Sequence, residues 1–325
     1  MKTPQIFNEF GHVISSSEDV ILIDDVIDEF VATKRSVNTR KAYTRDVSNA
    51  FEFLGVTELQ QLGRVQFYDL VANLLRHLEL ATIYDDETKR AENPKTVNRK
   101  AYAISAFFKF LIHSYGYPKN PMENYQAHKI QKRSNTPSLT AAQVIDVIAY
   151  FDMHHQKSQT KFRDYLAICC LAVLALRRNE LVGMKWSDIN FEDSTANVYQ
   201  KGGSYKLLPI APKLLKKFQE YKDKYASVDY VFSPVRNPVT GNLNKPLNTN
   251  YIYQLVSKTV FKVTKGKKAT PHSFRKSFIE IALNNQEDFI SIINATGHTT
   301  VEMVKYYDTR DTLKHNAVHG MAKLI

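Results

Sequence analysis

The sequence predicts a mainly α-helical protein with a small β-sheet, built as an N-terminal helical bundle followed by a mixed α/β domain. Three observations predict this class. Apolar residues recur at helical spacing along most of the chain, residues 195 to 210 have the pattern of a β-hairpin, and a polar, basic segment near residue 135 separates two helix-rich parts. The 325 residues are enough for two ordinary domains with their own apolar cores.

Residues 1 to 30 are expected to be an acidic N-terminal extension, and a helix that packs on the rest of the chain or on a partner is the alternative that the sequence leaves open. One lysine against seven carboxylates gives this segment a net charge of −6, and because the whole chain carries +11, the remainder carries +17. A body this basic suits a polyanion such as nucleic acid, and the alternative is a solubilising surface.

Residues 31 to 130 are expected to form the helical bundle. Apolar residues share one face of the segment 38 to 54, with Asn38 or Thr39 as its cap, and the segment 94 to 116 repeats the design. Residues 65 to 80 between them are also predicted to be helical. The basic side chains near the helix starts would lie at exposed edges and are candidates for binding DNA: Arg40, Lys41, Arg45, Arg99 and Lys100.

A basic linker is predicted at residues 131 to 139, where the composition is polar and contains proline. Its cations Lys132 and Arg133 are further candidates for contacts with DNA. Thr140 and Gln143 then fit a capping box that opens the next helix.

Residues 140 to 310 are expected to form the second domain. Residues 161 to 176 are apolar nearly all round, which predicts a buried helix, and Gly202-Gly203 lies between the two β-rich runs of the hairpin. Further helices are predicted at 213 to 225, 248 to 264, 273 to 284 and 287 to 295. The absence of a GKS/T or GxGxxG motif disfavours a nucleotide-driven enzyme.

Arg177 is predicted to lie at the end of the buried helix, three residues before Glu180. An arginine carried into a protein interior is costly to desolvate, so it should have a carboxylate or a phosphate as its partner. The two residues simply pairing with each other is the alternative interpretation.

Gly297 is predicted to end a helix in the left-handed conformation, and Thr299 to Glu302 fits a capping box for a new helix. His298 would then lie at a helix junction. Because Met303 and Val304 precede it by four and three residues, Tyr307 should share their inward face, whereas the neighbouring Tyr306 would be turned by about 100°.

These motifs, in this order, resemble those of the tyrosine recombinase (phage integrase, Xer-like) family. They are RxxEL from Arg177, a lysine with two glycines in a hairpin, HxxR from His272, and Gly-His followed nine positions later by a tyrosine. The resemblance spans about residues 30 to 310, including the N-terminal bundle. The sequence departs from the family in having Ala295-Thr296 before Gly-His and Lys276 after HxxR.

The resemblance implies a role for each motif residue. Arg177 and Arg275 would grip the scissile phosphate, and Tyr307 would attack it to leave a 3′-phosphotyrosyl bond, with Tyr306 as the alternative nucleophile. Lys201 would be the general acid, with Lys206 as its rival, and the alternative is that Lys201 is only a solvated turn residue. His272 and His298 would bind the phosphate and help to move the tyrosine proton, although His298 is alternatively a mere junction residue. Glu180 would be a supporting carboxylate.

The expected activity is site-specific recombination of double-stranded DNA, as in integrases and mobile elements, without metal, ATP or another cofactor. Four copies, or copies with a related recombinase, would assemble, and the tail 311 to 325 has apolar residues for exchange between protomers. The resemblance implies a prokaryotic, nucleoid-associated protein. A cytoplasmic location is expected because no apolar run approaches the roughly 20 residues of a membrane span. The alternatives are a non-catalytic DNA-binding protein on the same fold and a type IB topoisomerase.

Overall fold

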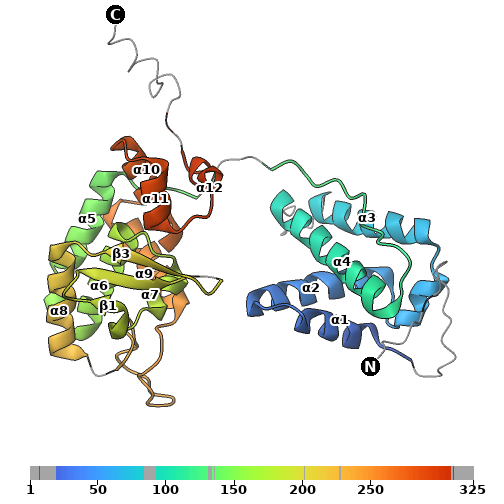
Figure 1. Cartoon of the computed structure of the whole chain (residues 1–325), viewed down its shortest axis with the longest axis horizontal. Helices are drawn as coiled ribbons and strands as arrows, with labels where there is room; N and C mark the ends of the chain where they lie inside the picture. Colours follow the sequence, from blue (N-terminus) through green and yellow to red (C-terminus); the bar gives the residue numbers. More distant parts are fainter. Residues whose placement is uncertain are drawn as a thin grey trace, which may run out of the picture. The chain divides into compact units, whose positions relative to one another are not determined.

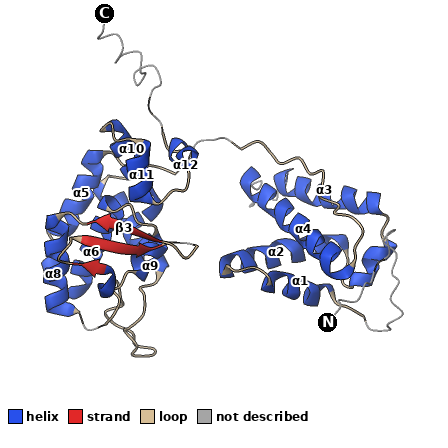
Figure 2. Ribbon diagram, in the orientation of Figure 1, coloured by secondary structure: helices blue, strands red, loops and turns tan. Residues whose placement is uncertain are grey.

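The computed structural model describes residues 7, 20 to 83, 93 to 130, 134, 136 to 200, 202 to 226, 228 to 308 and 310, and only the backbone of residues 81 to 83. The chain divides into two compact units, Met1–Gln131 and Lys132–Ile325, here called the N-terminal unit and the C-terminal unit (Figure 1). The three-stranded sheet lies in the C-terminal unit, and helices make up most of the rest (Figure 2). The predicted fold class is therefore confirmed.

The described part of the N-terminal unit is a helical bundle with an aromatic core. The ring of Phe107 meets those of Phe30 and Phe51 edge to face, with centroids 5.4 and 5.2 Å apart. Its elements are α1 (Ile23–Ala32), α2 (Val37–Leu54), the 3-10 helix η1 (Leu59–Arg64), α3 (Phe67–Ile83) and α4 (Pro94–Tyr115).

The bundle begins earlier than residue 31. Helix α1 buries Ile23, Val26, Ile27 and Phe30 in the core, while its acidic residues face solvent. The part of the expected extension that lies in α1 therefore belongs to the bundle, and its acidic residues form the polar face of that helix. The predicted cap of α2 was also wrong: Ser36 is the N-cap, because its hydroxyl accepts from the backbone N–H of Thr39.

The C-terminal unit packs helices around a short antiparallel sheet with strand order β1-β2-β3. Thr195 pairs with Pro209 and Tyr199 with Tyr205, so Gly202 and Gly203, both at positive φ, lie in the hairpin turn as predicted. The elements are α5 (Ala141–Asp152), η2 (His155–Lys157), α6 (Gln159–Val173), α7 (Arg178–Gly183), η3 (Trp186–Asp188), β1 (Ile189–Asn190), β2 (Thr195–Tyr199), β3 (Tyr205–Pro209), α8 (Pro212–Tyr225), α9 (Thr249–Val263), α10 (Pro271–Asn284), α11 (Phe289–Thr296) and α12 (Val301–Lys305).

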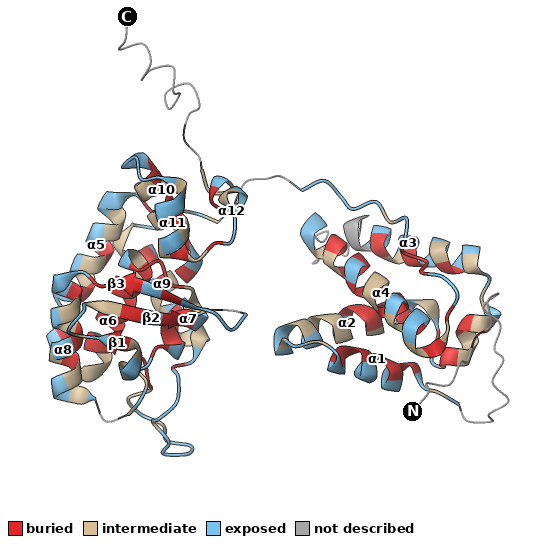
Figure 3. Ribbon diagram, in the orientation of Figure 1, coloured by how far each residue is buried: buried red, intermediate tan, exposed pale blue. Residues whose placement is uncertain are grey.

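Helix α6 runs through the main core of this unit, and Figure 3 shows buried positions gathered along it and along β2 and β3. A smaller apolar cluster of Ile279, Leu283, Ile292 and Val304 joins α10, α11 and α12. This cluster fixes the two short C-terminal helices against α10. No helix in the described part of the chain is long and apolar enough to cross a membrane.

The buried helix is shorter than predicted. It ends at Val173, and Ala175 adopts a positive φ of 49°, so the chain turns before it reaches Arg177. Arg177 has an extended backbone and is the N-cap of α7. The prediction that α6 carries Arg177 was therefore wrong, and a loop delivers this residue instead.

Candidate active site

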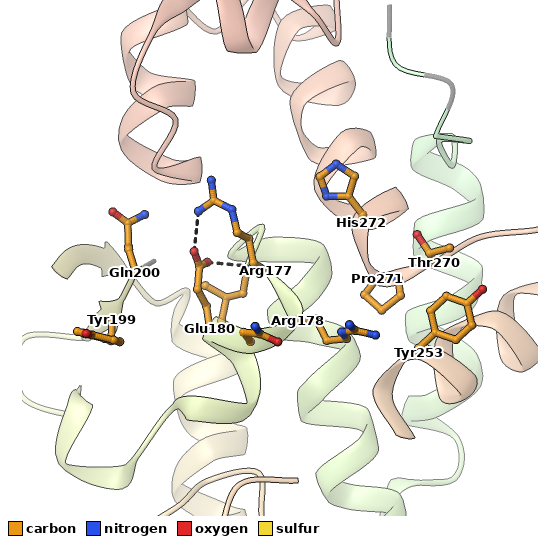
Figure 4. Close-up of a pocket in the computed structure, with 11 residues that line it drawn as sticks. Arg177, Arg178, Glu180, Tyr199, Gln200, Tyr253, Thr270, Pro271 and His272 are labelled. Atoms are coloured by element: carbon orange, nitrogen blue, oxygen red, sulfur yellow. Dashed lines mark hydrogen bonds and ion pairs between the residues drawn. The ribbon is translucent and has the colours of Figure 1, made fainter. Parts of the chain in front are cut away.

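A cavity of about 620 Å³ opens where α7, β2, α9 and α10 approach one another in the C-terminal unit (Figure 4). The residues lining it are Leu176, Arg177, Arg178, Asn179, Glu180, Tyr199, Gln200, Tyr253, Thr270, Pro271 and His272. Three of the predicted site residues, from two separate segments, thus share one cavity.

Arg177 and Glu180 are paired at one side of this cavity. Nη1 of Arg177 donates to Oε1 of Glu180 at 2.7 Å, and the backbone N–H of Arg177 donates to Oε2 at 2.9 Å. Glu180 is buried, whereas about a third of the Arg177 side chain is exposed. The pairing anticipated as an alternative is thus present, and it leaves the guanidinium accessible to an anion from the cavity.

Among the cations that the structure describes, Arg275 is the most deeply buried, with 1% of its surface exposed. Its Nη1 donates to the carbonyl of Ala175 at 2.8 Å and its Nη2 donates to the carbonyl of Thr296. Burial, and then the charge of Arg177, lower its pKa to about 10, so it stays charged at neutral pH. Its Nε is buried and has no partner among the described residues. An anion bound beside it would supply the missing acceptor.

His298 is held in a single tautomer. The hydroxyl of Thr296 donates to the carbonyl of Ile292 at 2.6 Å, so it must accept from Nδ1–H of His298, 2.8 Å away. Nε2 then carries a lone pair and lies 3.4 Å from Nη2 of Arg275. Burial, followed by the charges of Arg275 and Arg177, lowers the pKa of His298 to about 3, so the ring is neutral.

Tyr307 lies beside both predicted histidines. Its hydroxyl is 3.0 Å from Nε2 of His272, and its ring centroid is 5.7 Å from that of His298. Burial, and then Arg275 and Arg177, lower the pKa of His272, so a neutral ring can accept the hydroxyl proton. The neighbouring Tyr306 is held through its backbone, because its carbonyl accepts from the N–H of Ser134 at 3.4 Å.

The predicted inward face shared by Met303, Val304 and Tyr307 is only partly present. Val304 is fully buried in the small cluster that Tyr307 packs against, but Met303 is 42% exposed. Helix α12 ends at Lys305, so Tyr307 follows it in a turn rather than sharing its face. The N-cap is Thr300, whose hydroxyl accepts from Met303 N–H, instead of Thr299.

Lys201 lies outside the described residues, while its rival Lys206 is buried. Nζ of Lys206 donates to the carbonyl of Ala295 at 3.1 Å and lies 3.6 Å from Oε2 of Glu180. Burial lowers the pKa of Lys206 to about 8, with Glu180 opposing the shift. Lys206 therefore links the hairpin to the site by fixed contacts.

The C-terminal end of helix α11 collects three cations, which the sequence analysis missed. Lys206 donates to the carbonyls of Ala295 and Thr296, and Arg275 also donates to that of Thr296. Nη2 of Arg177 lies 3.5 Å from the carbonyl of Gly297. The last carbonyls of a helix lack intrahelical partners and carry partial negative charge, so these cations cap the helix and fix the junction before His298.

Gly297 ends α11 in the left-handed conformation, as predicted, with φ of 66°. The absence of its side chain also makes room for Gln200, the residue before Lys201: a Cβ at position 297 would collide with Nε2 of Gln200. That Nε2 is buried without a partner in the described part of the chain. Gln200 therefore docks the hairpin stem on the junction that bears His298.

The basic candidates of the N-terminal unit differ in placement. Arg40, Lys41 and Arg45 are exposed, as expected. Arg99 pairs with the buried carboxylate of Asp46. Lys100 is only 8% exposed, so its expected place on an exposed edge was wrong, because this side of α4 packs within the bundle. Lys132 and Arg133 lie outside the described residues.

The site gathers two arginines and two histidines, with the phenol of Tyr307 beside the histidines. The described residues include no group of three or more histidine, cysteine or acidic side chains placed to hold a metal ion. Two arginines, two neutral histidines and a tyrosine in contact with one of them can bind a phosphodiester and attack it. The class of protein that this fold and this site define is the tyrosine recombinases.

The chain belongs to the phage integrase family, whose model matches residues 138 to 313. The family's N-terminal SAM-like domain matches residues 28 to 114. Together these matches cover most of both units.

Curated relatives agree with this membership. Tyrosine recombinase XerD of Staphylococcus saprophyticus is 23% identical over 88% of this chain and 94% of its own length. Tyrosine recombinase XerA of Pyrococcus horikoshii is 31% identical over 68% of this chain and 71% of its own length. The chain is thus a tyrosine recombinase by sequence as well as by fold.

Solved structures show the same fold. The integrase of transposon Tn1549, in complex with a circular intermediate DNA, covers 94% of this chain and all of its own, with a TM-score of 0.65 at 19% identity. A lambda integrase dimer bound to a COC′ core site covers 92% of this chain and 79% of its own, with a TM-score of 0.64 at 16% identity.

Proposed function

We propose that this protein is a site-specific DNA recombinase that cleaves and rejoins duplex DNA through a 3′-phosphotyrosyl intermediate on Tyr307. The observation that carries the proposal is the 3.0 Å contact between the Tyr307 hydroxyl and Nε2 of a neutral His272, beside Arg275 and Arg177. A phenol with an unperturbed pKa near 10 needs a base to take its proton and cations to stabilise the charge at phosphorus.

In the proposed first step, the Tyr307 oxygen bonds to phosphorus while its proton passes to Nε2 of His272. The bond from phosphorus to the 5′ oxygen breaks, and Lys201 protonates that leaving oxygen. Attack by a 5′ hydroxyl reverses both changes and releases the tyrosine. Because the bond energy stays in the ester, rejoining needs no ATP.

Each cationic group has a part in this proposal. Arg177 and Arg275 bind the non-bridging phosphate oxygens and stabilise the charge that grows on them. Nε2 of His298 hydrogen-bonds the phosphate, and Glu180 holds Arg177 in place. We propose that these side chains supply the positive charge that a divalent metal would otherwise provide.

Duplex DNA is the proposed substrate of both units. The exposed cations Arg40, Lys41 and Arg45 of the N-terminal unit would contact phosphates, and affinity should fall steeply with salt. Lys132 and Arg133 are also proposed to contact DNA phosphates. Lys100 is no longer proposed to do so, because it is buried. Two strand exchanges at two sites require four protomers, joined through the tail 311 to 325. Integration or excision of a mobile element within a prokaryotic cell would use this activity.

A covalent-trapping experiment tests the proposal. A random-sequence pool of duplexes with a nick beside each candidate position would be incubated with the protein in EDTA without ATP, and adducts would be resolved on denaturing gels. Wild type should form an adduct that Tyr307→Phe does not, and Tyr306→Phe should retain it. An adduct that persists in Tyr307→Phe but is lost in Tyr306→Phe would reassign the nucleophile.

Further outcomes separate the alternatives. No adduct with any duplex, despite binding, would indicate a non-catalytic DNA-binding protein. Relaxation of supercoiled plasmid by a monomer without sequence preference would indicate a type IB topoisomerase. Enrichment of one sequence among the trapped duplexes, with four protomers in the synaptic complex, is the result expected of a recombinase.

A further inference from the structure

One arginine in the cavity has no part in the chemistry described above. Arg178 follows Arg177 directly and is the first residue of α7, and its side chain is half-buried. Figure 4 shows its guanidinium directed away from Glu180, toward the side of the cavity where Pro271 and Tyr253 lie. Within the part of the chain that the structure describes, it has no hydrogen bond or ion pair.

The charge around this arginine calls for an anion. The cavity is lined by two adjacent arginines and one carboxylate, and that carboxylate is already shared by Arg177 and Lys206. Arg178 therefore has no countercharge on the cavity wall. A half-buried guanidinium loses part of its hydration, and a phosphate or carboxylate oxygen would restore both the charge balance and the hydrogen bonds.

The size of the cavity indicates more than one phosphate group. Its volume of about 620 Å³ lies within the range of pockets that hold whole small-molecule ligands. The groups proposed to bind the scissile phosphate, Arg177, Arg275 and the two histidines, leave the side near Arg178 unassigned. Of these groups, Arg177 and His272 line the same cavity as Arg178, so a continuous DNA strand that delivers one phosphate to them can place its neighbouring nucleotide along this wall.

Tyr253 gives that wall an aromatic surface. Helix α9 buries Ile252, Val256 and Val260 in the core, whereas Tyr253 is 45% exposed and lines the cavity. Its ring can pack on a sugar, and its hydroxyl can donate to a phosphate oxygen. A planar arginine fork and a tyrosine hydroxyl are common partners of the DNA backbone.

We propose that Arg178 and Tyr253 form a second phosphate-binding subsite, which holds the DNA backbone phosphate next to the scissile one. This inference rests on the proposed function for the identity of its ligand. Arg178 binds the neighbouring phosphate through charge-assisted hydrogen bonds, and Tyr253 fixes the nucleotide between the two phosphates. The subsite thus sets the position of the strand along the cavity.

A salt titration tests the subsite without knowledge of the target sequence. Binding of a fluorescent 30-base-pair random-sequence duplex pool would be measured by anisotropy in the Tyr307→Phe background, where no adduct forms. Arg178→Gln should weaken binding about 10-fold and reduce the slope of log affinity against log salt by about 1. Arg178→Lys should restore the slope, because it restores the charge. Tyr253→Phe should weaken binding while leaving the slope as it is.

Arg236 provides the matched control, since it is an exposed arginine of the same unit that does not line the cavity. Equal losses in Arg178→Gln and Arg236→Gln would overturn the subsite and leave only a general charge effect. Thermal unfolding of each variant would show whether Arg178→Gln is folded, and if it is not, unchanged binding in Tyr253→Phe would overturn the subsite.

A duplex recovered by covalent trapping then locates the ligand. Neutral methylphosphonates would replace single phosphates on either side of the scissile one. In the Arg178→Gln variant, one of these replacements should lose its roughly 10-fold effect on affinity, because the contact between Arg178 and that phosphate is already gone. No coupling at any position, or an effect of Arg178→Gln that depends on base identity, would overturn the proposal. Failure of wild type to form any adduct would instead count against the proposed function, since the anisotropy measurements stand without it.

Discussion

The hydroxyl of Thr296 lies 2.8 Å from Nδ1 of His298 and donates its own proton to the carbonyl of Ile292, one helical turn earlier. The hydroxyl is therefore an acceptor for His298, which places the ring proton on Nδ1 and the lone pair on Nε2. Thr296 occupies one of the positions where this chain departs from the family pattern. The departure brings a hydrogen-bonding group to a histidine of the site.

Removing the Thr296 hydroxyl should impair cleavage. Thr296→Val keeps the shape of the side chain but frees the imidazole to change tautomer and orientation. Loss of one buried hydrogen bond costs about 1–2 kcal/mol, so single-turnover adduct formation should slow by about 10-fold. Thr299→Val is the control, because its hydroxyl donates to the sulfur of Met303 rather than to either histidine. Equal rates in wild type and Thr296→Val would show that the tautomer does not matter.

The identity of the general acid can be tested with a modified leaving group. A substrate with sulfur in place of the 5′ bridging oxygen leaves as a thiolate, which needs no proton. If Lys201 is the acid, Lys201→Ala should cleave the oxygen substrate slowly and the sulfur substrate at nearly the wild-type rate. Lys206→Ala should be impaired on both substrates, because its Nζ is bound to the carbonyl of Ala295 and contacts Glu180. Rescue of Lys206→Ala alone would reverse the assignment.

Acid should destabilise the C-terminal unit through His298. Its pKa is about 3 in the folded protein and 6.5 in the unfolded chain, so only the unfolded chain takes up the proton between these values. Stability is therefore unaffected above pH 7 and falls as the pH drops below 6.5, by about 2 kcal/mol at pH 5. His272 is shifted in the same direction. Urea unfolding at pH 7 and pH 5 should show this loss in wild type and a smaller one in His298→Asn.

Lys206 should be needed for the geometry of the site as well as for stability. Lys206→Met leaves Glu180 and two carbonyls at the end of α11 without one of their buried partners. Removing one member of a buried ion pair costs about 3 kcal/mol. Hydrogen exchange at the amides of Gly297 and His298 should accelerate, whereas Lys213→Met, at an exposed position of α8, should leave it unchanged. Unchanged exchange in Lys206→Met would refute its positioning role.

Gly297→Ala should disturb the hairpin through Gln200. A left-handed alanine costs roughly 1–2 kcal/mol, and its Cβ would displace the Gln200 side chain. Gln200→Ala in the same background should remove the steric part of the loss and retain the backbone part. A double-mutant cycle of unfolding free energies measures this coupling, and additive losses would mean that Gln200 moves aside freely.

Much of the local structure could be predicted because its causes are local. Helical periodicity, the capping box at Thr140 and Gln143, the glycines of the hairpin and the left-handed cap at Gly297 each depend on neighbouring residues. The errors were of two kinds: element boundaries misplaced by a few residues, as at the caps Ser36 and Thr300 and at the end of α6, and burial set by distant packing. Lys100 is buried by packing in the bundle, and α6 ends before Arg177.

The sequence by itself determined the mainly helical class, the two-part organisation and which polar residues recur in the order of a tyrosine recombinase. Only the tertiary structure decided how they act on one another. Arg275 reaches the carbonyl of Ala175, 100 residues away, and that of Thr296, and Lys206 reaches across 89 residues to Ala295. The charge state of His298 follows from the same convergence, because burial and neighbouring cations, rather than adjacent residues in the chain, set its pKa.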